Sequence, residues 1–376
     1  MNLTLHITDQ CNMRCAYCVH DYSPRTMSPE TAAAAVDLSV RLKGDPLIPS
    51  GCTHTGLCFY GGEPLLNRGL IEKTVGYCDA IRADQGEIFY YLIVTNGTLL
   101  DESFLEFAAV HDIGIGISHD GLMQEDTRRM EDGASSFDRL EKKIDMLLRY
   151  PLNVTAMCTI HPLFVDRLAE SVRWLFEKGF RKVQTVPAVG RKADWTPEAV
   201  GELEKQLALL SDLYVEKTRA GDNFELTLFE NKIRSHIMDG RGINQTCRFG
   251  KRQLSVAPDG AIYPCVQFLD LPEYRMGDVF NGLIPENVER VAGEGTDEPP
   301  ECQPCALRKR CKYNCCCMNR ITTGQINEIS PLTCAFERAA IRSADRAATI
   351  LMAEENPLFM KKHYTTILGK DPVFFE

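Results

Sequence analysis

The sequence has little of what marks a membrane-spanning, secreted or nucleic-acid-binding protein. No uncharged apolar run approaches the roughly 18 residues that a membrane span requires. The N-terminal stretch Met1–Asn12 has no basic region and no long apolar region, so it does not look like a signal peptide. Acidic residues outnumber basic ones, with 52 Asp and Glu against 42 Lys and Arg. A protein that binds nucleic acid normally has a basic surface. We therefore expect a cytoplasmic protein with no membrane segment and no nucleic-acid partner.

Cysteine, in contrast, is abundant, with 16 among 376 residues. A cytoplasmic compartment keeps thiols reduced, so clustered cysteines there are more often metal ligands than disulfides. Three of the cysteines fall within Cys11–Cys18 and six within Cys302–Cys317. The distribution therefore predicts metal ligation in two regions of the chain.

The first 230 residues alternate between strand and helix patterns. Ser28 is expected to cap a helix that begins at Pro29, and Asp101 to cap another. Roughly six β–α units with apolar strands predict a parallel sheet with right-handed crossovers, covered on both faces. The expected strands are 3–8, 57–60, 88–95, 113–118, 153–160 and 182–187, and further helices are expected over about 69–84 and 196–219.

The composition changes from about residue 240. Gly, Pro and Cys increase, and helical periodicity fades until about 334, which is typical of a loop-rich segment that needs metals or disulfides to hold it. A helical pattern returns over Ala335–Glu354. The expected domains are 1–230, 240–345 and a C-terminal tail over 346–376.

The first cysteine cluster has the spacing Cys11-x3-Cys15-x2-Cys18 and directly follows the first expected strand. It therefore lies at the carboxyl end of the sheet, where the active sites of parallel α/β folds gather. Three thiolates can hold three irons of a [4Fe–4S] cluster and leave the fourth iron open. A zinc knuckle is the alternative, but zinc normally takes four ligands, and only His20 lies near enough to be the fourth.

With Tyr17 before its last cysteine, this cluster resembles the signature of radical S-adenosylmethionine (SAM) enzymes. The resemblance implies a partial (β/α)6 TIM-like barrel and an open iron that binds the amino and carboxylate groups of SAM. One electron would then cleave SAM to a 5′-deoxyadenosyl radical, which removes hydrogen from an unactivated C–H bond. Tyr17 would cover the cluster near the adenine ring.

Further strand ends resemble motifs of the same family, in the same order along the chain. Gly61–Pro64 resembles the GGE motif for the methionine amino group, Thr95–Gly97 recurs in the family, and Ser118–Gly121 resembles its S-x-D-G element. Arg129 matches an arginine for the SAM carboxylate, with Arg128 as the alternative. The contacts to SAM implied by the resemblance are Tyr17, Gly61, Gly62, Glu63, Asn96, Ser118, Asp120 and Arg129.

The later cysteines, with Gly260, resemble the SPASM domain pattern C…G-x4-C…C-x2-C-x5-C-x3-C…C. The resemblance implies two auxiliary [4Fe–4S] clusters, so the expected cofactors are three clusters in all and SAM. The implied ligands of the outer auxiliary cluster are Cys302, Cys305, Cys311 and Cys334, and those of the inner one are Cys247, Cys265 and Cys315.

Two departures from the relatives concern the inner cluster. Fully ligated relatives carry another cysteine shortly after the first, but 248–264 contains none, so either an iron stays open or Cys316 or Cys317 completes the ligand set. Anaerobic sulfatase-maturating enzymes have an aspartate after the G-x4-C cysteine, as the proton acceptor in formylglycine formation. Here Val266 occupies that position and cannot accept a proton, although Asp270 is a nearby carboxylate.

Four cysteines fit neither pattern. Cys58 and Cys158 lie within apolar strands and Cys78 has core spacing on a helix, so these three are expected in the core. Cys52 has no assigned role.

These residues favour a peptide maturase that installs a thioether, C–C or C–O crosslink in a ribosomally made precursor peptide. Sulfatase maturation is the alternative within the class. An iron–sulfur electron carrier or a zinc-binding adaptor is the alternative of another class, but neither needs the GGEP and S-x-D-G positions. The expected reductant is a flavodoxin- or ferredoxin-type protein. Because the chain starts at its first strand, leader recognition would come from the tail or from a separate recognition protein, or be absent.

Overall fold

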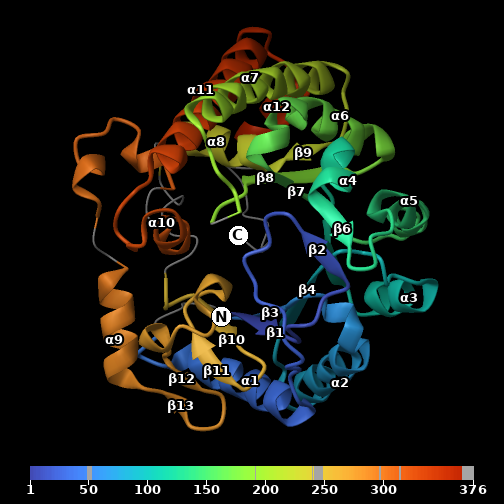
Figure 1. Ribbon diagram of the computed structural model, residues 1–376, viewed down its shortest axis with the longest axis vertical. Coiled ribbons are helices and arrows are strands. Elements are labelled where there is room, and N and C mark those ends of the chain that lie inside the picture. Colours follow the sequence, from blue (N-terminus) through green and yellow to red (C-terminus); the bar gives the residue numbers. More distant parts are fainter. Residues whose placement is uncertain are drawn as a thin grey trace. The chain divides into compact units, whose positions relative to one another are not determined.

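The computed structural model describes residues 1–48, 53–190, 192–238, 240, 249–295, 298–312 and 315–365 (Figure 1). The chain divides into two compact units, each built from segments that are distant in sequence. Unit 1 comprises Met1–Ser118, Arg128–Val154 and Cys247–Asp297, and unit 2 comprises His119–Thr127, Thr155–Thr246 and Glu298–Glu376. The domain limits drawn from composition stay a prediction.

Unit 1 is organised around a mainly parallel sheet, as the α/β class requires. Its parallel strands, in sheet order, are β10 (Gln253–Val256), β1 (Asn2–His6), β3 (Thr55–Tyr60), β4 (Phe89–Thr95) and β5 (Ile113–Ser118). Three short antiparallel strands extend it beyond β10, namely β11 (Ala261–Tyr263), β12 (Gly277–Asp278) and β13 (Gly282–Leu283). A separate antiparallel ribbon joins β2 (Met13–Cys15) to β6 (Arg128–Met130).

Helices connect these strands and begin where the sequence predicts. Ser28 Oγ accepts a hydrogen bond from Thr31 N at 3.1 Å, and Asp101 Oδ1 accepts one from Phe104 N at 2.8 Å, so both predicted helix caps are confirmed. The helices of unit 1 are α1 (Pro29–Arg41), α2 (Arg68–Gln85), α3 (Glu102–Val110), α5 (Ser136–Leu147) and α9 (Pro285–Glu294).

The two faces of the sheet in unit 1 differ in burial. On β3, Leu57 and Phe59 are fully buried, whereas the alternate residues Cys58 and Tyr60 are half-buried. Successive side chains of a strand point to opposite faces, so one face forms the core and the other is partly open. Tyr60 ends β3 on the open face, next to the loops that follow the strands.

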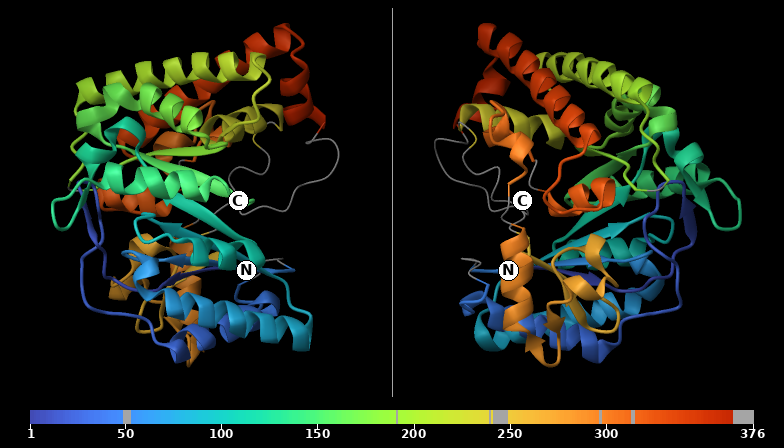
Figure 2. Two further views of the ribbon diagram at one scale, coloured as in Figure 1. Left: turned by 90° about the vertical axis from the view of Figure 1, so that its right-hand side faces the viewer. Right: turned by 60° about the vertical axis from the view of Figure 1, so that its left-hand side comes forward.

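Unit 2 combines a shorter parallel sheet with long helices. Figure 2 shows α7 (Pro197–Arg219) and α11 (Pro331–Ala353) running side by side, and the two helices pack directly against each other. The strands are β7 (Val154–Ile160), β8 (Lys182–Pro187) and β9 (Glu225–Leu226). The other helices are α4 (Gln124–Thr127), α6 (Leu168–Lys178), α8 (Thr227–Ile237), α10 (Cys316–Thr323) and α12 (Pro357–Met360).

The segment from 240 to 334 contains more regular structure than its composition predicts. Its strands β10–β13 are two to four residues long, and α9 and α10 have 10 and 8 residues. Helices and strands this short contain too few repeats of the apolar spacing to be recognised from the sequence.

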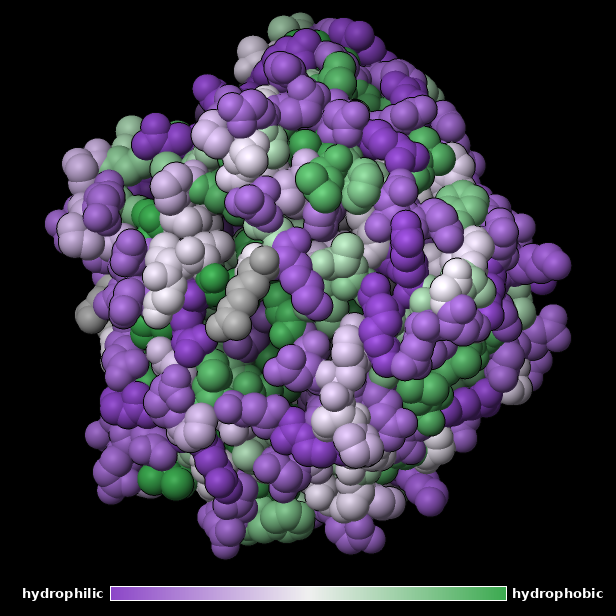
Figure 3. All heavy atoms as spheres, in the orientation of Figure 1, coloured by the Kyte–Doolittle hydropathy of each residue, from purple (hydrophilic) through white to green (hydrophobic). Residues whose placement is uncertain are grey.

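No helix in the described part of the chain is both long and apolar enough to cross a membrane. Hydrophilic side chains cover most of the face shown in Figure 3.

Candidate functional site

The segment before Cys11 lies directly against the GGEP turn after β3. Gly62 N donates to Thr8 O at 2.7 Å and Glu63 N donates to Gln10 O at 2.8 Å. A Cβ on Gly62 would lie only 2.2 Å from Gln10 O, which no side chain tolerates. In the described structure the glycines therefore serve the close approach of two backbone segments. Their predicted role in approaching a ligand stays a prediction.

Glu63 is fully buried and ties the loops after β3 and β4 together. Its carboxylate accepts hydrogen bonds from Thr95 Oγ1 at 2.6 Å, from Asn96 N at 2.7 Å and from Leu65 N at 3.0 Å. Burial raises the pKa of Glu63 to about 7, although these hydrogen bonds act to lower it. Since a carboxylate has roughly four acceptor positions, Glu63 can still accept one more donor, such as an ammonium group.

Asn96 holds the cysteine loop itself. Its side-chain amide donates to Asn12 Oδ1 at 2.8 Å and lies 3.9 Å from Cys11 Sγ, while its oxygen accepts from Thr98 Oγ1 at 2.7 Å. Asn96 thus positions the loop that carries the first cysteine.

The three cysteines of this loop are close enough to interact electrostatically. All three are half-buried, and Met13 N donates to Cys11 Sγ at 3.4 Å. Burial raises the pKa of Cys11 to about 12, and negative charge on Glu63, Cys15 and Cys18 acts in the same direction. Neighbouring thiols that disfavour one another's ionisation need a cationic centre before they can act as thiolates. The donor set therefore fits three ligands of an iron–sulfur cluster.

The β2–β6 ribbon distinguishes the two candidate arginines. It places Arg128 opposite Cys15, and Arg129 opposite Arg14. Arg128 is only 7% exposed, and its guanidinium carbon lies 5.2 Å from the centre of the Tyr17 ring, whereas Arg129 is exposed. The geometry thus favours the alternative Arg128, and the match to Arg129 stays a prediction.

The two polar positions of the S-x-D-G element lie in different surroundings. Ser118 is half-buried at the end of β5. Asp120 is fully buried, and its carboxylate accepts from Thr159 N at 2.8 Å and Thr127 Oγ1 at 2.7 Å. Asp120 is therefore engaged by protein donors, which gives it a structural role whatever its part in binding.

Asp270, the carboxylate that could replace the missing aspartate, also accepts hydrogen bonds from a protein side chain. Asp270, which has a positive φ of 61°, accepts from Arg25 Nη1 at 2.9 Å, and the same guanidinium donates to Asp9 Oδ2 at 2.6 Å. Cys265 is half-buried, and Val266 starts a 3-10 turn directly after it. Cys247 and Cys52 lie outside the described residues.

His20, the candidate zinc ligand, belongs to a polar cluster that continues from Asp9 and that the sequence did not predict as a whole. His6, which is 2% exposed, bonds Asp9 Oδ1 through Nε2 at 3.1 Å. The His20 ring lies 5.4 Å from His6 and 5.8 Å from Tyr60, and burial lowers the pKa of His20 to about 4. The pairing of His6 with Tyr60 across β1 and β3 is the signal that could have found this cluster, once the strand register is known.

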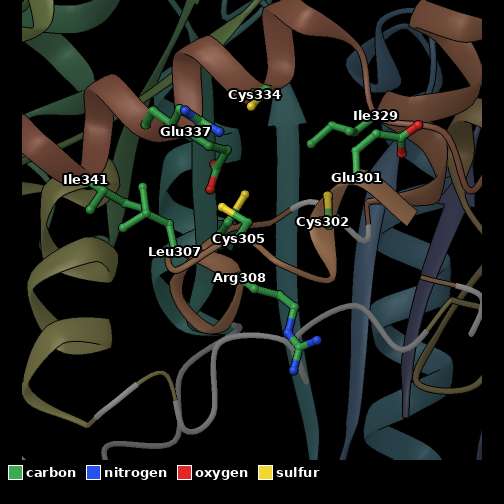
Figure 4. Close-up of a pocket in the computed structure, with 11 residues that line it drawn as sticks. Glu301, Cys302, Cys305, Leu307, Arg308, Ile329, Cys334, Glu337 and Ile341 are labelled. Atoms are coloured by element: carbon green, nitrogen blue, oxygen red, sulfur yellow. The ribbon is translucent and has the colours of Figure 1, made fainter. Parts of the chain in front are cut away.

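Four later cysteines line a single pocket in unit 2, the outer cluster pocket. Figure 4 shows Cys302, Cys305 and Cys334 around it, and Cys311 also lines it. Its volume of about 110 Å³ far exceeds the roughly 10–15 Å³ that one water needs. Burial raises the pKa of Cys302, and charge on Cys305 and Cys334 adds to the effect. Four thiols are the donor set of a [4Fe–4S] cluster, and also of structural zinc.

Glu337, which lines the pocket, belongs to a buried ion pair. Lys232 Nζ lies 2.5 Å from Glu337 Oε2, and the two residues are 1% and 4% exposed. Glu337 also accepts from Lys312 N at 2.7 Å, and Lys232 donates to Arg310 O at 3.3 Å. The pair thus connects α8 and α11 to the loop that carries three of the cysteines.

The run of three cysteines splits into two environments. Cys315 Sγ lies 3.3 Å from Cys317 Sγ, whereas Cys316 is 4% exposed and faces the interior. The hydrogen bond from Cys317 lowers the pKa of Cys315 to about 7. Of the two candidates for an additional ligand, Cys317 is the one beside Cys315.

Comparisons with known proteins identify a related family and a shared fold. Residues 5–175 match the model of the radical SAM superfamily. A cysteine-type anaerobic sulfatase-maturating enzyme of Clostridium perfringens is 22% identical over 320 residues, which cover 81% of this chain and 85% of the relative. The solved structure of native anSMEcpe with bound AdoMet has a TM-score of 0.77 at 20% identity and covers 94% of this chain and 99% of its own. Streptococcus suis SuiB bound to precursor peptide SuiA has a TM-score of 0.63 at 16% identity, covering 88% and 75%. At these identities the structural likeness concerns the fold.

Proposed function

Since this chain is a radical SAM enzyme, we propose that it is a peptide maturase that installs a crosslink in a precursor peptide. The cysteine loop after β1, held by the GGEP turn and Asn96, carries the proposal, because it gathers three thiols at the carboxyl end of a parallel sheet. When bound there, the cluster and SAM supply a carbon-centred radical that removes hydrogen. The protein supplies binding, orientation and electrostatics.

The residues of unit 1 divide the work of holding SAM. Cys11, Cys15 and Cys18 would ligate three irons. The unused acceptor position of Glu63 suits the SAM ammonium group, and Arg128, beside Tyr17, suits its carboxylate. Ser118, half-buried at the end of β5, would contact the ribose or the carboxylate.

Two observations support a crosslink over formylglycine. Val266 stands where the proton-accepting aspartate of the sulfatase-maturating relatives is expected, and a valine accepts no proton. The nearby carboxylate, Asp270, is paired with Arg25. Both oxygens of that carboxylate already accept hydrogen bonds from the Arg25 guanidinium.

Sulfatase maturation is the second candidate, and the relatives favour it, since the curated protein described above is an anaerobic sulfatase-maturating enzyme. SuiB, whose solved structure contains its precursor peptide, favours the crosslink. A precursor peptide is the proposed substrate of the crosslinking enzyme. A flavodoxin- or ferredoxin-type reductant and a separate recognition protein are its proposed partners.

Mass spectrometry after turnover separates the two candidates. The purified enzyme is given SAM, reductant and two peptides, a precursor encoded beside the enzyme and a peptide that spans a sulfatase active-site cysteine or serine. We expect the precursor to lose two hydrogens, with protection of one cysteine from iodoacetamide if the bond is a thioether. An aldehyde on the sulfatase peptide, with an unchanged precursor, would overturn the crosslink proposal.

Iron analysis tests the cofactor content. We propose three [4Fe–4S] clusters, or about twelve irons per chain. Alanine at Cys11, Cys15 and Cys18 should remove one third of the iron and all SAM cleavage. Alanine at the four cysteines of the outer cluster pocket should remove another third and leave SAM cleavage in place. Iron near four per wild-type chain would refute both auxiliary clusters.

A further inference from the structure

The charged side chains that line the outer cluster pocket differ in whether they form an ion pair. The charged residues that line the pocket are Glu301, Arg308, Glu337 and Arg338. Glu337 is neutralised by Lys232, and Arg308 lies 3.4 Å from Glu298. Among the described ion pairs none involves Arg338. Arg338 is therefore the lining cation whose charge no described carboxylate offsets.

Arg338 is directed at the cysteines by its place on α11. It follows Cys334 by four residues, and side chains four apart on a helix share a face. Arg338 lines the pocket together with Cys334, Cys305 and Cys311, and negative charge on these cysteines raises the pKa of the guanidinium. Three of the four thiols of the pocket thus act on this one cation.

We propose that Arg338 raises the reduction potential of the outer auxiliary cluster by donating an N–H to Cys334. The inference rests on the proposed outer cluster. A cluster held by four thiolates is anionic, and reduction adds one more negative charge. A nearby cation and a hydrogen bond to a ligand sulfur both stabilise the reduced form. The outer cluster then takes up an electron more readily than its thiolates alone would allow, which suits an electron acceptor in the oxidative step of crosslinking.

The matched control lies one turn further along the same helix. Arg342 is also exposed, but it pairs with Glu204 at 3.1 Å and does not line the pocket. Arg338→Gln and Arg342→Gln therefore remove the same charge from the same helix, and only the first removes a donor to a cysteine. Arg338→Lys keeps the charge and loses the planar guanidinium fork.

The test is an EPR-monitored redox titration of the full-length, cluster-loaded protein. Alanine at Cys11, Cys15 and Cys18 removes the signal of the SAM-binding cluster. Alanine at the four pocket cysteines then identifies which remaining midpoint belongs to the outer cluster. We expect Arg338→Gln to lower the reduced-to-oxidised ratio of that cluster at a fixed potential by up to about tenfold, equivalent to 59 mV. Arg338→Lys should shift it less, and Arg342→Gln should leave it unchanged.

Three results would overturn the inference. Equal midpoints in Arg338→Gln and Arg342→Gln would show that Arg338 does not tune the cluster. Loss of the outer iron in Arg338→Gln alone would show that the arginine is needed for assembly. Iron that is insensitive to the four pocket cysteines would refute the outer cluster itself, and with it the proposed cofactor content, so the two failures remain distinguishable.

Discussion

Removing the positive charge of the buried Lys232–Glu337 pair is expected to destabilise unit 2 strongly. Lys232→Met keeps most of the side-chain volume but leaves Glu337 buried at 4% exposure without its partner. Breaking a buried ion pair in this way costs about 3–5 kcal/mol, because a charge remains without compensation. With a urea m-value of about 1–3 kcal/mol/M, the urea midpoint should fall by at least about 1 M.

A second variant separates charge burial from packing. In Lys232→Met/Glu337→Leu both charges are gone, and replacing a buried pair by apolar groups is often close to neutral. Lys312 N loses its acceptor in this variant, which costs about 1 kcal/mol. We therefore expect the double variant to be more stable than the single one. Lys205→Met, which removes an exposed pair with Glu202, is the control and should cost less than about 1 kcal/mol.

Tryptophan fluorescence during urea unfolding is the assay. The chain has 2 tryptophans, Trp174 and Trp195, and both lie in unit 2 together with Lys232 and Glu337. The signal therefore reports on the unit that is perturbed, and a two-state transition of the whole chain need not be assumed. A Lys232→Met variant within 1 kcal/mol of wild type, or a double variant no more stable than the single one, would refute the reasoning.

Three further predictions concern SAM binding, measured by equilibrium dialysis on cluster-loaded protein. Burial raises the pKa of Glu63 to about 7, so below that pH an ammonium ligand must displace a proton. As the pH is lowered below 7, SAM affinity should therefore fall about tenfold per pH unit in the wild type, whereas the affinity of Glu63→Gln should not change with pH. The same pH dependence in both proteins would exclude the contact between Glu63 and SAM. Arg128→Ala should weaken SAM binding and Arg129→Ala should not, since only Arg128 lies over Tyr17; the reverse order would restore the sequence match to Arg129. Ser118→Ala should cost roughly 1–3 kcal/mol of SAM binding at unchanged iron content, and unaltered affinity would remove Ser118 from the site.

Local signals in the sequence predicted six of the parallel strands, but not that Met13–Cys15 of the cysteine segment forms the short strand β2. The strand expected over 113–118 is β5, and that expected over 182–187 is β8. Such elements are visible because their apolar runs and the turns after them are contiguous in the chain. The core positions expected for Cys78 and Cys158 are confirmed, while Cys58 is half-buried because β3 turns it to the open face.

Contacts between distant residues could not be predicted in this way. Lys232 and Glu337 are 105 residues apart, and Arg25 and Asp270 are 245 apart. Neither pair has a local pattern, because the partners meet only once the helices and strands have packed. The preference for Arg128 over Arg129 depends likewise on the register of β6 against β2.

The β2–β6 ribbon also bears on when the first cluster can be inserted in the cell. Arg14 and Glu131, which pair across this ribbon, are 117 residues apart in sequence. At about 5–20 residues per second, a ribosome adds that length of chain in roughly 6–23 s. During this interval Cys11, Cys15 and Cys18 are already made, but the strand that shapes one side of their loop is not. We therefore expect iron delivery to follow synthesis of β6, and carriers that protect nascent thiols to raise the yield of loaded enzyme.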